Sequence, residues 1–321
     1  MNLAPSLSLK LGKSTRQAFG ETLAEIGARR GDVVVIDGDV NNSTYTNLFA
    51  KQFPDRFFNL GIAESNMVSV AAGLAGSGKV PVVASFACFL VCNAFDQLRM
   101  SVAFPGLNVK LVGTHAGISI GEDGPSQMGI EDVALACALP GCAVVVPADE
   151  PSARRATAAI IDHTGPCYLR LGRPPVPIVY SDGCEVTLGK ANPLRDGRDV
   201  TLVANGIMVA LALEAAERLA ARGLSARVLD MHTVKPLDTD ALAQAARETG
   251  ALVVAEEHLH YGGLGTAVAA ALAAVQPVPI RFVNLGDRFA ESGTAEALLE
   301  KYGLRAERIV TAADKAIAAK Q

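Results

Sequence analysis

Short apolar runs rich in Val, Ile and Leu alternate with longer Ala-rich segments along the chain. In the first half, the apolar runs predict strands over residues 33–37, 80–85, 109–113, 143–147 and 168–172. The segments between them predict helices over residues 17–29, 64–77, 89–103 and 152–162. Ser14, followed by Gln17 three residues later, is a capping-box signal for the first helix. Such alternation is typical of a parallel sheet with helical crossovers.

A segment rich in Pro, Gly and charge interrupts this alternation and predicts a linker over residues 176–198. The alternation then resumes, with strands predicted over 200–204, 226–230, 252–256 and 280–284. Helices are predicted over 207–222, 239–248, 265–275 and 306–320. We therefore predict an α/β fold with two parallel-sheet domains, over residues 1–175 and 199–321.

Composition and charge narrow the class of protein. Half of the residues are hydrophobic, only 5% are aromatic and there is no Trp, which suits buried parallel strands. The net charge of −4 gives no field that attracts nucleic acid or an anionic membrane. The six cysteines lie in apolar surroundings without C-x-x-C spacing, which indicates reduced thiols, and no signal peptide or membrane-spanning stretch is present. We expect a cytoplasmic protein without a nucleic acid or membrane partner.

Polar groups stand where a plain α/β domain does not need them. Glu64 lies at the start of a predicted helix, where the helix dipole favours a carboxylate even without any function. Phe86 and Phe89 lie at the end of a predicted strand, where ligands dock in open parallel sheets, although core packing is an alternative role. The five scattered histidines predict no metal cluster, so we expect no metal site within this chain.

Two further segments follow predicted strands. Residues 113–127 combine many Gly with His115, Asp123 and Gln127, and a loop this polar and Gly-rich favours a functional role. Arg170 and Arg173 lie at the end of the strand predicted over 168–172, and an arginine at a strand end suits a phosphate.

The order of these motifs resembles the transketolase family over essentially the whole chain. The matching residues, in order, are Arg16 in S-T-R, Asp39 and Ser43 in G-D-V-x-x-S, Glu64 in G-I-A-E, Phe86 and Phe89 in F-x-x-F, His115 in T-H, Asp123 in G-E-D-G-P, and Arg173. Residues 200–285 are similar to the C-terminal domain of that family. The resemblance implies a pyrimidine-binding domain followed by a transketolase C-terminal domain.

The resemblance also implies a thiamine diphosphate enzyme with Glu64 and His115 as catalytic residues. Glu64 would hydrogen-bond the ring nitrogen of the aminopyrimidine, Phe86 and Phe89 would hold that ring, and Asp39 would lie near the cofactor. His115 would also hydrogen-bond the donor sugar.

The remaining matched residues are expected to bind a sugar phosphate. Arg16, Ser43 and Arg173 would hold its phosphate, and Asp123 would hydrogen-bond its hydroxyls. Two positions depart from the family pattern: Cys92 replaces a third pocket aromatic, and Gln127 replaces a His. Because Gln hydrogen-bonds a hydroxyl but cannot shuttle a proton at neutral pH, an altered donor or acceptor sugar is expected.

The chain contains no Gly-Asp-Gly, which the family uses to bind diphosphate and metal. The resemblance therefore implies a separate N-terminal transketolase subunit that supplies this part, with Mg²⁺ or Ca²⁺, in a heterotetramer that acts in pentose phosphate metabolism. Two alternatives stay open at this point. One is the β-subunit of a 2-oxo acid dehydrogenase or a deoxyxylulose-phosphate synthase-like enzyme, and the other is a non-catalytic scaffold subunit.

Overall fold

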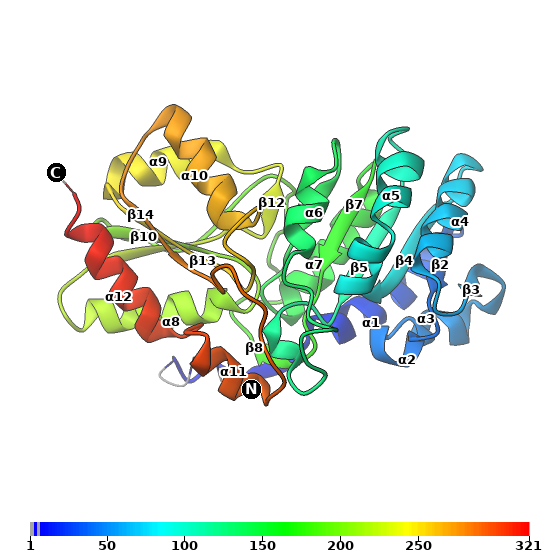
Figure 1. Cartoon of the computed structure of the whole chain (residues 1–321), viewed down its shortest axis with the longest axis horizontal. Helices are drawn as coiled ribbons and strands as arrows, with labels where there is room; N and C mark the ends of the chain where they lie inside the picture. Colours follow the sequence, from blue (N-terminus) through cyan, green and yellow to red (C-terminus); the bar gives the residue numbers. More distant parts are fainter. Residues whose placement is uncertain (1–2, 5–6, 321) are drawn as a thin grey trace.

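The computed structural model describes residues 3–4 and 7–320, which form two α/β domains (Figure 1). The first sheet has the strand order β12-β6-β7-β5-β4-β2-β3, and its neighbours are parallel except for β12 against β6. Its strands are β2 (Val33–Asp37), β3 (Phe57–Asn59), β4 (Val80–Phe86), β5 (Lys110–Thr114), β6 (Ala143–Val145), β7 (Cys167–Arg170) and β12 (Thr233–Lys235). Five of these strands confirm the sequence prediction, whereas β3 and β12 were not predicted.

The second sheet has the order β14-β13-β10-β11-β9, and only β9 runs antiparallel to its neighbour. Its strands are β9 (Asn192–Arg195), β10 (Val200–Ala204), β11 (Ala226–Asp230), β13 (Leu252–Ala255) and β14 (Ile280–Val283). The last four confirm the predicted strands. Near the predicted linker, β8 (Pro175–Pro177) pairs antiparallel with β1 (Leu11–Ser14).

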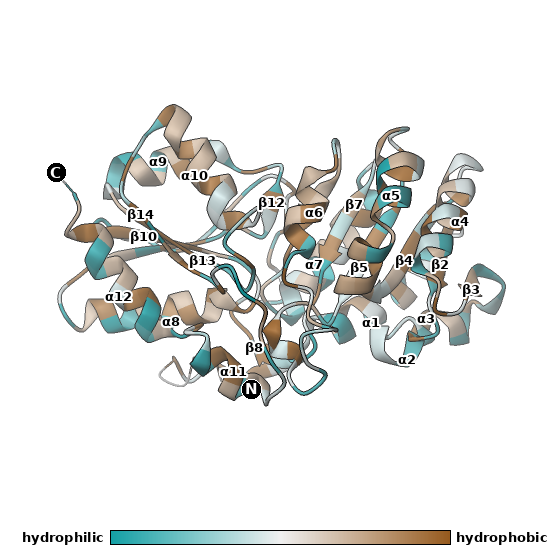
Figure 2. Ribbon diagram, viewed as in Figure 1, coloured by the Kyte–Doolittle hydropathy of each residue, from teal (hydrophilic) through white to brown (hydrophobic). Residues whose placement is uncertain are grey.

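Helices cover both faces of each sheet (Figures 1 and 2). On the first sheet, α1 (Thr15–Arg29), α3 (Asn47–Gln52) and α7 (Glu150–Asp162) pack on one face, and α4 (Glu64–Gly76) and α6 (Asp132–Ala138) on the other. Side chains alternate between the two faces along β4. Val82 and Ala84 pack into the hydrophobic core with α1, α3 and α7, whereas Val83 packs into the core with α4 and α6. On the second sheet, α8 (Met208–Ala220) and α12 (Ala306–Ile317) lie opposite α9 (Thr239–Thr249) and α10 (Leu264–Val275).

The helix predicted over residues 89–103 is irregular. Phe89–Asn93 and Leu98–Ala103 are wound as π-helix, with α5 (Phe95–Gln97) between them. Such wide turns inside a helix are frequent at functional sites. None of the helices among the described residues is long and apolar enough to span a bilayer.

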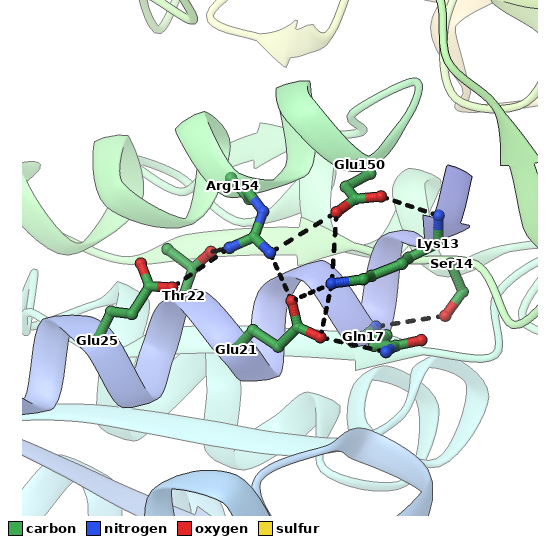
Figure 3. A network of polar contacts seen from close by, with 8 residues as sticks. All are labelled: Lys13, Ser14, Gln17, Glu21, Thr22, Glu25, Glu150 and Arg154. Atoms are coloured by element: carbon green, nitrogen blue, oxygen red, sulfur yellow. Dashed lines mark hydrogen bonds and ion pairs between the residues drawn. The ribbon is translucent and has the colours of Figure 1, made fainter. Parts of the chain in front are cut away.

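A polar network fixes the start of α1 against α7 (Figure 3). Ser14 is the predicted N-cap, and its hydroxyl accepts a hydrogen bond from the Gln17 backbone at 3.3 Å. The reciprocal half of the predicted capping box is wrong, because the Gln17 side chain donates to Glu21 instead. Glu21 also pairs with Lys13 at 2.8 Å and with Arg154 of α7 at 2.5 Å. The network therefore holds the first turn of α1, which carries Arg16.

Candidate active site

Glu64 is the first residue of α4, and it is buried with 3% of its surface exposed. The Ser85 hydroxyl, near the end of β4, donates to Glu64 Oε1 at 2.9 Å. The Asn93 amide, at the end of the first π-helical turn, donates to Glu64 Oε2 at 3.5 Å. A helix start, a strand end and a π-turn thus fix the orientation of one carboxylate.

Two aromatic residues follow Ser85 in the chain: Phe86 is the last residue of β4, and Phe89 begins the first π-helical turn. Phe86 and Phe89 are half-buried, and their rings are nearly parallel, with centroids 5.9 Å apart and planes at 12°. A third ring between them needs about 7 Å, twice the usual carbon–carbon contact distance. The two phenylalanines therefore leave no room for a ring between them and form a single wall.

His115 extends this wall. Its ring stacks on Phe86 with centroids 3.8 Å apart, and its backbone has a positive φ of 58° directly after β5. Arg16 Nη1 lies 3.1 Å from His115 Nε2. Because a guanidinium only donates, Nε2 accepts, and the ring proton resides on Nδ1, which donates to the Thr114 hydroxyl at 2.8 Å. Burial, together with the charges of Arg16 and Arg173, lowers the pKa of His115 to about 3, so the ring is neutral at pH 7.

Arg16 and Arg173 line a common open groove of about 280 Å³, together with Ser119 and Ala295. Arg16 donates to the Ser43 carbonyl at 2.6 Å, which places the turn containing Ser43 beside the groove. Its pKa is lowered by burial, with a further contribution from Arg173. The lining also contains Glu122, but the two cations outnumber this one carboxylate, and the excess of positive charge suits an anionic ligand.

Two acidic side chains of the Gly-rich loop flank Arg173. The Nη1 atom of Arg173 donates to Asp123 Oδ1 at 3.1 Å and lies 3.9 Å from Glu122 Oε2. The same nitrogen donates to the Ile120 carbonyl at 2.8 Å. The loop therefore holds Arg173 at the edge of the groove, with Asp123 exposed beside it.

Among the described residues, no hydrogen bond joins Gln127 or Asp39 to Glu64, Phe86 or His115. The Gln127 side chain accepts a hydrogen bond from the Ser126 hydroxyl at 2.6 Å. The Gln127 backbone carbonyl accepts from the thiol of Cys88, the residue before Phe89, at 3.2 Å. Asp39 is exposed and accepts from the Asn59 amide at 2.8 Å.

Cys92 is exposed and faces Glu131, with its Sγ 3.6 Å from Glu131 Oε1. Although the residue as a whole is exposed, neighbouring atoms partly desolvate its sulfur, and this desolvation together with the charge of Glu131 raises the pKa of Cys92 to about 12, so the thiol is protonated at neutral pH. At the position of a third aromatic, this side chain is small and uncharged.

Three structural residues of the site were not predicted. Asp37 at the end of β2 is buried and accepts from the Val40 backbone at 2.8 Å and the Thr44 hydroxyl at 2.7 Å, which shapes the turn that carries Ser43. An Asp at a strand end followed by hydroxyl residues was the available signal. Asn93 carried no pattern of its own.

The third is Glu257, which comes from the second domain. Its carboxylate accepts from the Ser119 backbone at 2.6 Å and from the Ser119 hydroxyl at 3.3 Å. Burial raises the pKa of Glu257 to about 7, despite the nearby charge of Arg170. This contact joins the second domain to the Gly-rich loop of the first.

Arg170 does not line the groove with Arg173. Its Nε pairs with the buried Asp132 at 2.8 Å, and its Nη2 donates to the carbonyls of Gly129 and Glu257, each at 2.9 Å. The Arg170 guanidinium therefore has a structural role rather than a ligand-binding one.

The two domains match two parts of one enzyme family. Residues 12–178 match the family described as "Transketolase, pyrimidine binding domain", and residues 189–309 match "Transketolase, C-terminal domain". The chain therefore belongs to the transketolase family, as the order of its motifs predicted. The pyrimidine-binding domain implies the use of thiamine diphosphate.

Several relatives that cover nearly the whole chain are described as transketolase subunits or as a split-gene transketolase. The chain is 44% identical over 298 residues to a 6-deoxy-6-sulfo-D-fructose transketolase subunit of a Clostridium species, covering 93% of this chain and 92% of that one. It is 38% identical over 295 residues to an apulose-4-phosphate transketolase subunit of Phocaeicola vulgatus, covering 92% and 94%. A solved split-gene transketolase, described as an inactive beta4 tetramer, superposes with a TM-score of 0.89 at 46% identity, covering 97% of this chain and 100% of that one.

The residues present fit only one end of thiamine diphosphate. The buried carboxylate of Glu64 and the wall formed by Phe86 and Phe89 offer an acceptor and a stacking surface to a heterocycle. Within the described part of the chain, no three His, Cys, Asp or Glu side chains are grouped to bind a metal, and the full sequence has no Gly-Asp-Gly.

Proposed function

We propose that this chain is the C-terminal subunit of a two-chain transketolase, which transfers a two-carbon ketol unit from a ketose phosphate to an aldose phosphate. The observation that carries the proposal is the buried Glu64 carboxylate, oriented by Ser85 beside the wall of Phe86 and Phe89. Thiamine diphosphate supplies the carbanion chemistry when it is bound. Glu64 would hold the ring nitrogen of its aminopyrimidine, and Asp39 would lie near the cofactor.

The groove would bind the anionic end of the sugar. Arg16 and Arg173 would contact the terminal phosphate, with Ser43 beside them, because both guanidinium groups already line this groove. Neutral His115 would accept a hydrogen bond from a donor-sugar hydroxyl at Nε2, where Arg16 now donates. Asp123 and Gln127 on the Gly-rich loop would hydrogen-bond further hydroxyls.

A partner subunit would complete the site. We propose an N-terminal transketolase subunit that binds the diphosphate with Mg²⁺ or Ca²⁺, in a cytoplasmic heterotetramer of two chains of each kind. The lack of Gly-Asp-Gly supports this proposal, as does the description of two relatives as subunits. The beta4 tetramer described as inactive is consistent with a chain that needs a partner for activity.

The test is a coupled ketol-transfer assay on the co-expressed pair, with a pentulose phosphate as donor. Glu64→Gln keeps the shape of the side chain but removes its charge, so we expect about a hundredfold or greater loss of turnover with normal assembly on size exclusion. The matched control is Glu185→Gln, since Glu185 is exposed and its side chain makes no hydrogen bond or ion pair among the described residues.

Each alternative predicts a different outcome. Unchanged turnover in Glu64→Gln favours the scaffold role, and decarboxylation of pyruvate without ketol transfer favours the dehydrogenase or synthase class. Two relatives are named for a sulfonated and a phosphorylated sugar, so the assay should include donors of both kinds. The two groove arginines suit either anion.

A further inference from the structure

A second basic cavity lies in the C-terminal domain, between the edge strand β14 and helix α12. Its volume is about 180 Å³, and it shares no lining residue with the groove that contains Arg16 and Arg173. The polar side chains that line it are Arg281, Asn284, Tyr302, Arg308, Thr311 and Lys315. The lining has three cations and no carboxylate, in a chain whose net charge is −4.

The spacing along α12 explains this concentration of positive charge. Arg308, Thr311 and Lys315 are three and four residues apart, so they occupy one face of the helix. The acidic residues next to Arg308 and Lys315 in the sequence form ion pairs outside the cavity. Glu307 pairs with Arg218 of α8, and Asp314 pairs with Arg222 at 2.9 Å. The carboxylates that could neutralise Arg308 and Lys315 along the helix are thus occupied elsewhere.

The cations of the cavity have no anionic partner among the described residues. Arg281 donates only to the carbonyl of Ile280, at 2.9 Å, and neither Arg308 nor Lys315 forms an ion pair within that part of the chain. Like charges that share a small cavity repel one another unless an anion lies between them. The arrangement therefore favours bound negative charge.

Asn284 gives an independent indication of a ligand. Its Oδ1 accepts from the Gly286 backbone at 3.0 Å, which fixes the amide, while its Nδ2 is buried without a hydrogen-bond partner among the described residues. A buried amide donor left unpaired is costly. Because Asn284 lines the cavity, an oxygen of a bound anion is a natural acceptor for it.

We propose that this cavity is a binding site for a small phosphate-bearing anion, separate from the candidate active site. Three cationic side chains and one amide donor match a tetrahedral oxyanion, and the volume is below the roughly 300 Å³ of sites for drug-sized ligands. The proposal is independent of the proposed enzymatic function, because it depends on no residue of the groove or of the aromatic wall.

The test measures binding of inorganic phosphate to the full-length chain by titration calorimetry at low salt. Arg16→Gln with Arg173→Gln first removes the groove as a phosphate site, and binding should persist in that background. Adding Arg308→Gln and Lys315→Gln should weaken it about tenfold or more, since two charge-assisted contacts are lost. Both residues are exposed, so the fold should be retained, as an unchanged circular dichroism spectrum would show.

The charge-matched control adds Lys51→Gln and Lys79→Gln to the same background, two exposed lysines outside the cavity lining. This control should change affinity by less than about twofold, because it removes the same net charge without touching the site. Wild-type crystals soaked in tungstate, a heavy analogue of phosphate, should show an anomalous peak between Arg281, Arg308 and Lys315. Loss of all phosphate binding in the Arg16, Arg173 background, or an empty cavity in the soaked crystals, would overturn the proposal.

Discussion

The buried ion pair between Asp132 and Arg170 offers a quantitative test of how the site is held together. Asp132 is fully buried, and its Oδ2 accepts both from Arg170 Nε at 2.8 Å and from the Tyr168 hydroxyl at 2.6 Å. Arg170 in turn donates to the Glu257 carbonyl, so this pair anchors the contact between the two domains. Removing the carboxylate leaves the buried guanidinium without the counter-charge to which it is hydrogen-bonded, and Glu257 is then the other carboxyl group whose charge acts on it.

Two substitutions separate the charge from the hydrogen bonds. Asp132→Ala removes both, and breaking a buried pair in this way costs about 3–5 kcal/mol. Asp132→Asn keeps an acceptor for Arg170 and Tyr168, and its new amide replaces Oδ1, which has no partner among the described residues. Both hydrogen bonds lose their ionised acceptor, so that only the bond from Arg170 keeps a charged partner; with each bond weaker by about 1 kcal/mol, a loss of about 2 kcal/mol is expected.

The assay is urea unfolding of the full-length chain, followed by circular dichroism. Asp55→Ala serves as the control, because Asp55 is exposed and forms no ion pair or side-chain hydrogen bond in the described part of the chain, and it should change stability by less than about 0.5 kcal/mol. The reasoning fails if Asp132→Asn is as destabilising as Asp132→Ala, or if neither loses more than the control.

Three further predictions concern pH, the domain contact and the α1–α7 network. The pKa of His115 is about 3, below the ordinary 6.5, so the unfolded chain takes up this proton first and the free energy of unfolding should fall as pH drops from 6.5 towards 3. Urea unfolding at about pH 7.5 and about pH 5 should therefore show a smaller loss of stability between the two pH values for His115→Gln than for the wild type. Gly117 has a φ of +81°, and an added Cβ would lie 2.2 Å from the Glu257 carboxyl carbon, so Gly117→Ala should lower stability by about 2 kcal/mol or more, whereas Gly31→Ala, where nothing lies within 4 Å, should change it little. Arg154→Met should cost no more than about 1 kcal/mol, and the loss should shrink in high salt, because its ion pairs are partly exposed.

Most of the strands that the sequence predicted are buried on both faces, although β14, which was also predicted, has three half-buried residues of four. Every residue of β2 and β10 is buried, so each strand is an uninterrupted apolar run that stands out against its neighbours. The strands β3 and β12 have three residues each, and β3 is half-exposed. Their pairing is determined by residues far apart in the sequence. For example, β12 follows β11 of the second sheet along the chain, yet it pairs with β6 of the first sheet. No local pattern contains that information.

In the candidate site, too, local sequence position predicted some features, whereas others depend on contacts between residues far apart in the sequence. Glu64 begins a helix, Phe86 ends a strand and His115 follows one, so the order of elements predicted the edge of the sheet where they meet. Arg170 and Arg173 are three residues apart, and both suited a phosphate by position. Only the structure distinguishes them, because the buried partner of Arg170 lies 38 residues away in sequence.

The second domain is a structural part of the candidate site, although a separate family describes it. Glu257 accepts a hydrogen bond from the backbone of Ser119 in the Gly-rich loop, and Ala295 lines the groove that contains Arg16 and Arg173. One hydrophobic cluster also runs from Val83 and Leu111 of the first sheet to Val203 and Val254 of the second. A core shared in this way couples the stability of the two domains, since neither can expose its side of the cluster without cost. The Gly-rich loop thus depends on both domains, and a truncated pyrimidine-binding domain would lose the contacts that shape its groove.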